Sequence, residues 1–384
     1  MKKIAKLSLV AAVAVAGLTT ANAKSLEEAI KNVDISGTAA YRYDDRSSDD
    51  QSEANLSNNS YKIAVNLKSK INDDLTLNTK TIIGRDNHNI IGSNNGDMAA
   101  LATDSADQNA AFALSQVNFA YTGFANTTII AGQQAVPSPF AVQADAAGDE
   151  DNGTGITAVV NAGAVTVAAT YLNQTNLEAI DGQDVAGLGL MANVGPVALD
   201  AWYLNVLESS TADTGHQAYT VGAKAKVDVV SLYARYSAIA HDSTADTESL
   251  WKVGAKAKVG IIGFGVDYGQ TNDIDNAPVS GASLTGDADA ATSMQGWALN
   301  LENKDDASLL KLNVNADVMT GINLSANYNI YEGATSNDDA KEYYGQLTHK
   351  MGKNFMYYVR LGQVDQDAKT DKGTRGRLHV QYSF

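Results

Sequence analysis

The sequence predicts an all-β chain that forms a transmembrane antiparallel β-barrel of about 18 strands, with short periplasmic turns and long extracellular loops. Three observations carry this prediction. Apolar and polar residues alternate through segments of roughly ten residues, as in tilted membrane strands. Short turns alternate along the chain with long polar loops. Beyond the N-terminal segment, no apolar run is long enough for a membrane helix.

The alternation is clearest in the last segment, "RGRLHVQYSF". Successive side chains of a strand leave opposite faces, so residues two apart share a face. One face here is apolar and the other is polar or charged. The apolar residues are Leu378, Val380, Tyr382 and Phe384, and Arg375, Arg377 and His379 alternate with them.

Two distant strands share the stretch "VGAKAKV", at Val221–Val227 and Val253–Val259, with lysines on one face of each. In a soluble sandwich the apolar faces would meet in a core. Exposure of the apolar faces to lipid explains the pattern better than a soluble sandwich does, because a closed barrel satisfies every backbone polar group without an open edge. We therefore expect apolar faces to contact lipid and charged faces to surround a lumen. A barrel of about 18 strands is too wide for side chains to fill its lumen, so we expect the lumen to contain water.

The strand count follows from the rhythm of turns and loops. The segment "SMQGWALNLEN" (293–303) also resembles a strand, but a single-chain barrel needs an even number, so it is placed within the long loop 270–306. The strands are expected near 35–43, 60–70, 75–84, 111–122, 126–133, 154–161, 164–172, 187–194, 197–206, 217–227, 229–237, 249–259, 262–269, 307–317, 321–331, 342–350, 354–364 and 375–384.

Residues 1–23 have the features of a cleaved signal peptide, leaving 24–384 as the barrel domain. Lys2, Lys3 and Lys6 precede an apolar core, and Ala21-Asn22-Ala23 provides a small-residue cleavage site. A short helix is expected at "KSLEEAIKNVD", where Ser25 and Glu28 can form a capping box. These features predict export to the bacterial outer membrane.

Composition excludes several function classes. The net charge of −16 argues against nucleic-acid binding. The chain has no Cys, and its five His are scattered without an HExxH motif. No G-x-S-x-G nucleophile elbow occurs either. We therefore expect neither an enzyme nor a cofactor.

Three stretches carry a family resemblance: "SLEEAIKNVDISGTAAYRYD", "TTIIAGQQ" (Thr127 to Gln134) and the ending "LHVQYSF". Together they resemble the major outer-membrane porins of Campylobacter and related bacteria. The resemblance implies an eighteen-stranded homotrimer, set among lipid and lipopolysaccharide, through which ions and small hydrophilic solutes diffuse passively. It further implies that Phe384 belongs to an assembly signal. A third loop, near 135–153, is expected to fold inward and narrow the pore.

The acids of this third loop are the candidate constriction residues: Asp145, Asp149, Glu150 and Asp151. They are expected to face lumen bases, namely Arg42, Lys62, Lys80, Arg360, Arg375 and Arg377. Opposed charges across a narrow gap create a transverse field that acts on permeating ions. Since acidic loops would dominate the pore mouth, we predict a weak cation preference. The alternative is that these acids form an ordinary solvated loop surface.

Acidic clusters at 272–276 and 286–290 could hold Ca²⁺ through carboxylate oxygens. Neither has the spacing of an EF-hand loop, so solvated loops are the favoured interpretation and no metal site is predicted.

Alternative functions follow from the same fold. The barrel could serve as a surface adhesin or structural anchor through its long loops, or as a substrate-specific channel. The third loop lacks an aromatic ladder for sugars, which disfavours a sugar channel. A soluble secreted β-protein would instead bury its apolar faces.

Overall fold

The computed structural model describes residues 33–47, 56–84, 98–101, 111–148, 150–176, 184–207, 215–241, 247–274, 290–366 and 372–384. The predicted signal peptide and short helix lie outside the described residues, as does Asp149.

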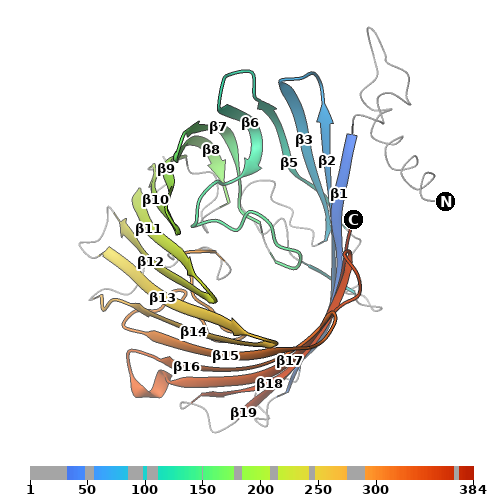
Figure 1. The fold of residues 1–384 in the computed structure, drawn as a ribbon, viewed down its shortest axis with the longest axis vertical. Coiled ribbons are helices and arrows are strands. Elements are labelled where there is room, and N and C mark those ends of the chain that lie inside the picture. Colours follow the sequence, from blue (N-terminus) through green and yellow to red (C-terminus); the bar gives the residue numbers. More distant parts are fainter. Residues whose placement is uncertain are drawn as a thin grey trace, which may run out of the picture.

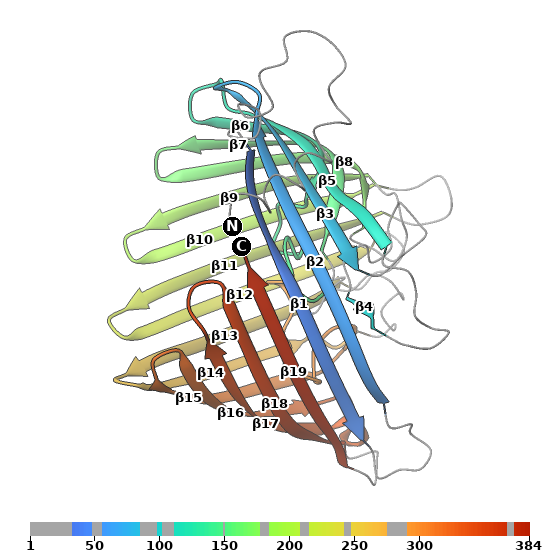
Figure 2. The same ribbon diagram turned by 90° about the vertical axis from the view of Figure 1, so that its right-hand side faces the viewer.

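All strands belong to one antiparallel sheet that closes on itself (Figure 1). Each long strand pairs with its neighbours in sequence, and the barrel closes where β1 (Val33–Ser47) pairs with β19 (Lys372–Ser383). The register of this closing pair runs from Thr38 opposite Ser383 to Ser47 opposite Thr374. Figure 2 shows the closing strands side by side and the tilt of the strands around the wall.

The strands between these two complete the wall: β2 (Leu56–Lys70), β3 (Leu75–Gly84), β4 (Ala99–Ala100), β5 (Ala111–Tyr121), β6 (Thr127–Ala135), β7 (Asn152–Ala162), β8 (Val165–Thr175), β9 (Val185–Val194), β10 (Val197–Val206), β11 (His216–Val227), β12 (Val230–His241), β13 (Thr247–Val259), β14 (Ile262–Thr271), β15 (Ser308–Met319), β16 (Ile322–Glu332), β17 (Ala340–Lys350) and β18 (Phe355–Gln366). A single 3₁₀ turn, η1 (Ser336–Asp338), precedes β17 among the described residues.

The predicted barrel of 18 strands is confirmed, and every expected strand is present. The alternation does not predict β4, a two-residue strand that pairs with β2 at Ser60 and Tyr61. The segment 293–303 forms no wall strand, and its strand pairing is limited to an isolated bridge between Gln295 and Asn300. The requirement for an even number of strands therefore correctly excluded this segment from the wall.

The two faces of the wall differ as the alternation predicts. On β11, Tyr219 and Val221 are 40% and 53% exposed, whereas Thr220 between them is 0% exposed. Large exposed apolar side chains occur in the same way on most strands, among them Leu190, Phe264 and Leu361. A soluble protein rarely leaves so large an apolar surface exposed, and a lipid-facing barrel requires it.

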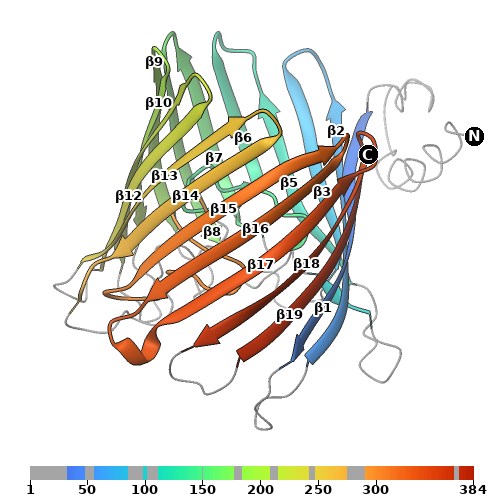
Figure 3. The ribbon, with the colours of Figure 1, turned by 60° about the horizontal axis from the view of Figure 1, so that its bottom comes forward.

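Short turns gather at one end of the barrel, together with the C-terminus (Figure 3). Gly163 and Gly195 occupy the two-residue hairpin turns with φ values of 69° and 58°. Glycine adopts this left-handed backbone without strain, which suits turns between twisted strands. In the part of the chain that the structure describes, no helix has the length and apolar character to cross a membrane.

The main buried cluster lies inside the barrel. It joins inward-facing residues of the wall, such as Leu204, Leu250 and Leu309, to Phe140, Met294 and Leu299, which belong to two long loops. The segment after β6 crosses the interior of the ring (Figure 1). The lumen is therefore partly occupied by its own loops.

Candidate channel constriction

The third long loop, residues 136–151 between β6 and β7, folds into the barrel (Figure 1). Its base is closed by backbone hydrogen bonds from Val136 N to Asp151 O (3.0 Å) and from Asp151 N to Val142 O (2.7 Å). Val136 is 0% exposed and Phe140 is 5% exposed. These contacts hold the loop as a packed element.

Two wall lysines anchor the tip of the third loop. Lys62 Nζ on β2 donates hydrogen bonds to the carbonyl oxygens of Asp145 (2.7 Å) and Gly148 (2.9 Å) and lies 3.4 Å from Glu150 Oε1. Lys80 on β3 forms an ion pair with the other oxygen of Glu150. Lys62 is 0% exposed, Lys80 7% and Glu150 2%. A buried ion pair persists only where each charge is neutralised and hydrogen-bonded.

Asp151 and Asp145 stabilise the loop from within. Asp151 Oδ2 accepts a hydrogen bond from Val142 N (2.6 Å), and Asp145 Oδ1 accepts one from Ala147 N (2.8 Å). Asp151 is 6% exposed and Asp145 is half-buried. The charge available to act on a permeating ion therefore differs between the acids. Glu150 is neutralised by lysines, whereas Asp145 keeps a partly accessible carboxylate.

The four predicted arginines converge on the part of the wall where the sheet closes, on β1, β18 and β19, next to the lysine-bearing β2. Cross-strand register places Arg377 beside Asp44 on one side and beside Arg360 on the other. Arg375 precedes Arg377 by two residues, so both lie on the inward face of β19. Arg375 is opposite Arg46 of β1. Arg42 lies opposite His379 in the same pairing. Closure of the sheet thus brings together residues from both ends of the chain.

These arginines have different partners. Arg377 Nε donates a hydrogen bond to Asp44 Oδ1 (2.5 Å). Arg360 Nε donates one to Gln346 Oε1 (2.7 Å), and its guanidinium carbon lies 4.9 Å from the ring centre of Tyr344 and 5.1 Å from that of Trp297. The Nε atom of Arg42 is buried and has no hydrogen-bond partner among the described residues. His379 is 3% exposed and its ring stacks on Tyr358.

A second inward segment, residues 290–307 before β15, escaped the sequence analysis as a constriction element. Glu342 on β17 is 1% exposed, and its carboxylate accepts hydrogen bonds from the backbone N–H groups of Trp297 and Ala298, both at 2.7 Å. Lys252 on β13 donates to the carbonyl of Ser293. Inward-facing wall residues thus hold the segment inside the lumen.

The two inward elements touch each other. Thr292 N donates a hydrogen bond to Pro139 O (3.2 Å), and Phe140 shares a buried cluster with Met294 and Leu299. The signal in the sequence was the apolar content of "SMQGWALNLEN", which is unusual for a solvated loop. Its buried partners lie on β13 and β17, too far along the chain for local patterning to reveal them.

The described residues hold no group of three or more His, Asp or Glu side chains able to bind a metal ion. Residues 286–289 and 275–276 of the two acidic stretches lie outside the described residues. The Ca²⁺ hypothesis thus remains a hypothesis for those positions.

An 18-stranded barrel with a lipid-compatible outer face, a polar inner face and an inward third loop defines the class of outer-membrane porins. Solved porins share the fold. OccAB3 of Acinetobacter baumannii matches with a TM-score of 0.67 at 12% identity, over 92% of this chain and 99% of that one. A BenF-like porin of Pseudomonas fluorescens Pf-5 matches with a TM-score of 0.69 at 11% identity, over 92% and 99%.

The sequence itself places the chain within this class. It belongs to the Campylobacter major outer membrane protein family, whose model matches residues 1–375. The resemblance found in the sequence is thereby confirmed, and the protein is a porin of the outer membrane. No curated protein matches the chain in a direct comparison. A third solved structure, Pseudomonas aeruginosa OpdK with vanillate, has a TM-score of 0.67 at 11% identity, covering 91% of this chain and 98% of that one.

Proposed function

We propose that this porin is a general diffusion channel, through which ions and small hydrophilic solutes pass passively, and that it catalyses no reaction. The observation that supports the proposal most is the polar inner wall outside the two inward elements. Lys224 and Lys226 on β11 and Lys256 on β13 are exposed on the lumen side, where a filled barrel would bury them.

Passage through the constriction then depends on three groups: the third loop, Trp297 and the arginine wall, which is the name we give to Arg42, Arg360, Arg375 and Arg377. The predicted constriction acids contribute unequally in this proposal. Glu150 and Asp151 hold the loop in place, while Asp145 remains accessible to ions. Positive charge comes from the neighbouring part of the wall, β1, β18 and β19, which carries Arg42, Arg360, Arg375 and Arg377. The expected weak cation preference therefore rests on Asp145 and on Asp149, which lies outside the described residues.

We further propose that the mature chain is a homotrimer in lipid and lipopolysaccharide, exported with cleavage after Ala23. Phe384 supports the assembly part of this proposal: its backbone N–H and C=O pair with Gly37 on β1, so the last residue joins the closing seam. An aromatic end residue at the seam is available to an assembly factor until the barrel closes.

Planar-bilayer recording of the purified protein tests the proposal. A general diffusion porin gives ohmic conductance that many small solutes reduce only slightly, and a trimer closes in three equal steps. Absence of conductance in correctly folded protein would favour the structural or adhesin role. Strong block by one solute class alone would favour a substrate-specific channel.

A further inference from the structure

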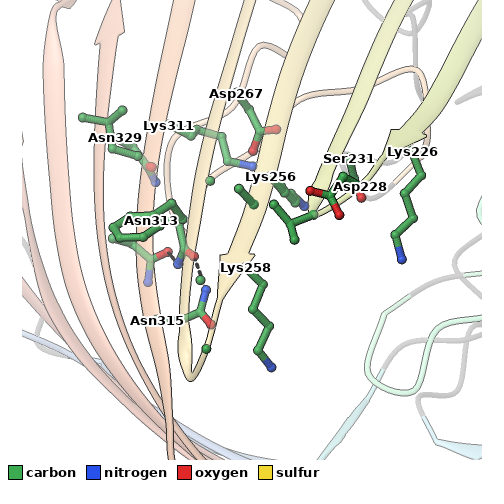
Figure 4. A pocket seen from close by; sticks show the side chains of 18 of the residues that line it. Lys226, Asp228, Ser231, Lys256, Lys258, Asp267, Lys311, Asn313, Asn315 and Asn329 are labelled. Carbon is green, nitrogen blue, oxygen red and sulfur yellow. Dashed lines mark hydrogen bonds between the residues drawn. The ribbon is translucent and has the colours of Figure 1, made fainter.

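The inner wall from β11 to β17 contains a recess of about 810 Å³ (Figure 4). In the strand order it lies across the barrel from β2 and β3, which carry the third-loop anchor. Its defining residues are Lys226, Ser231, Lys256, Lys311, Asn313 and Asn327, and we call it the lysine recess. It lies toward the turn end, since the β11–β12 turn residue Asp228 and the β13–β14 turn residue Gly260 also line it. Neither inward loop contributes to its lining.

Strand register explains how distant lysines meet in this recess. Each residue of the row lies directly opposite the next on the neighbouring strand, and all face inward. The row is Lys226, Ser231, Lys256, Gly265, Asn313 and Asn327, from β11 to β16. The repeated "VGAKAKV" stretch thus places one lysine of each copy in a single row, separated by a serine.

Gly265 makes room in the middle of the row. A Cβ added there would meet ordinary contacts, 3.6 Å from Asn313 Cβ and 3.7 Å from Lys256 Cγ. Packing therefore does not demand glycine at this position. The missing side chain instead leaves a trough between the lysine side and the asparagine side of the recess.

Positive charge exceeds negative charge around the trough. Lys258 pairs with Asp317, and Lys252 donates to Ser293 O, so both are engaged. Within the described residues, by contrast, Lys224, Lys226, Lys256 and Lys311 form no hydrogen bond or ion pair. The carboxylates of the recess are Asp228 in the turn and Asp267, which lies opposite Lys311. Of these lysines, Lys226, Lys256 and Lys311 line the recess, so three unpaired ammonium groups face its two carboxylates.

The opposite side of the trough offers amides. Asn313 Nδ2 donates to Asn327 Oδ1 (2.7 Å), and Asn315 Nδ2 donates to Asn313 Oδ1 (2.8 Å). A row of oriented amides binds hydroxyl and carboxyl oxygens, whereas separate ammonium groups attract an anion that carries several charged oxygens. A chloride ion can satisfy only one of these features at a time.

We propose that the lysine recess is a binding site for small polyvalent organic anions with two or more carboxylate or phosphate groups, which occupy it on their way through the pore. Lys256 and Lys311 bind the charged groups of the anion from the two sides of Gly265. Lys226 adds electrostatic attraction at the turn end. The asparagines form hydrogen bonds with the remaining polar groups of the anion. The site rests on the open channel proposed above.

Citrate titration in planar bilayers tests the site, with KCl conductance measured first for every variant. Millimolar citrate should lower the wild-type current slightly and saturably, without blocking it, by occupying the recess. Lys256→Gln and Lys311→Gln should each weaken the apparent citrate affinity about fivefold, the range expected for one solvent-exposed charge pair. Their KCl conductance should stay near wild type.

Lys68→Gln is the matched control, because Lys68 is an exposed inward-facing lysine on β2, outside the recess. It should leave citrate affinity unchanged. Equal weakening in all three variants would overturn the proposal by showing general charge screening of the lumen. An open wild-type channel indifferent to citrate would also overturn it, while leaving the channel proposal intact. A closed wild-type channel would instead reject the channel proposal.

Discussion

Two groups of inward-facing lysines lie on different parts of the same barrel wall, and their environments are opposite. Lys62 and Lys80 are buried beneath the third loop and share the Glu150 carboxylate. Lys226 and Lys256 are exposed and unpaired in the described structure. The same residue type on the same face therefore has two physical roles: loop anchor on β2 and β3, and lining of the aqueous path on β11 and β13.

The difference arises from what covers each lysine. An ammonium group taken out of water needs a counter-charge and hydrogen-bond acceptors, and the third loop supplies both to Lys62 through Glu150 and two carbonyls. A lysine that faces a water-filled lumen needs neither. Removing charge from the first group should therefore change the shape of the pore, and removing it from the second group should change only its electrostatics.

The largest effect is expected for Glu150→Ala, which leaves Lys62 and Lys80 buried without a counter-charge. Breaking a buried pair in this way costs about 3–5 kcal/mol, so the loop should leave the wall. We expect a larger single-channel conductance and faster proteolysis of the loop, measured on detergent-purified protein. Wild-type conductance and protease resistance in this variant would contradict the anchor role.

A companion variant sharpens this prediction. Replacing Lys62 and Lys80 by Met together with Glu150→Leu removes all three charges, so no buried charge is orphaned. Apolar replacement of buried ion pairs is often close to neutral. The triple variant should therefore recover protease resistance relative to Glu150→Ala. The same sensitivity in both variants would show that the hydrogen bonds to the loop carbonyls dominate the anchoring.

The second anchor should give a somewhat smaller effect. Glu342→Gln keeps one acceptor oxygen for the 290–307 segment but loses the charge that strengthens its two hydrogen bonds. A hydrogen bond to a charged group contributes about 1.5–3 kcal/mol. We expect higher open-channel noise and a moderate rise in conductance. Glu332→Gln is the control, because among the described residues Glu332 accepts one hydrogen bond, from Ser308 Oγ at 3.4 Å.

Trp297→Ala should act more weakly still, through the arginine wall. The guanidinium carbon of Arg360 lies 5.1 Å from the Trp297 ring centre, an attraction of about 0.5–2 kcal/mol. Loss of the ring should free Arg360 and shift the reversal potential under a KCl gradient toward anions. Trp251→Ala, on the outer face where Trp251 is 41% exposed, should leave the reversal potential unchanged.

The smallest effect is expected for Lys258→Gln. This lysine pairs with Asp317, but both side chains are largely exposed, at 57% and 45%. Exposed ion pairs contribute little to stability because water already solvates both charges. Thermal unfolding in detergent should match wild type. A clear loss of stability would mean that exposed lumen pairs support the barrel as buried ones do.

The fold was accessible from the sequence because the barrel imposes a local signal on each strand. The alternation of apolar and polar residues identified the wall strands, and the requirement for an even number of strands excluded 293–303 from the wall. The two-residue β4 escaped, since Ala99 and Ala100 carry no periodic pattern. The outer face followed from Tyr219, Val221 and similar residues, whose spacing alone assigns them to one side.

The constriction was only partly accessible. The acids of the third loop could be named, but the pairing of Glu150 with Lys62 and Lys80 spans 88 and 70 residues of chain. The sequence of a loop alone also does not predict whether the loop folds into the barrel. The 290–307 segment folds inward because Glu342 and Lys252 supply partners from other strands, and nothing local to it specifies them.

The central claim is that a water-filled path remains between the two inward loops and the charged wall. Single-channel recording of the wild-type protein across a KCl gradient tests it most directly. We expect stable ohmic steps with a finite ion selectivity. Folded, heat-modifiable protein that inserts into bilayers yet passes no current would contradict it.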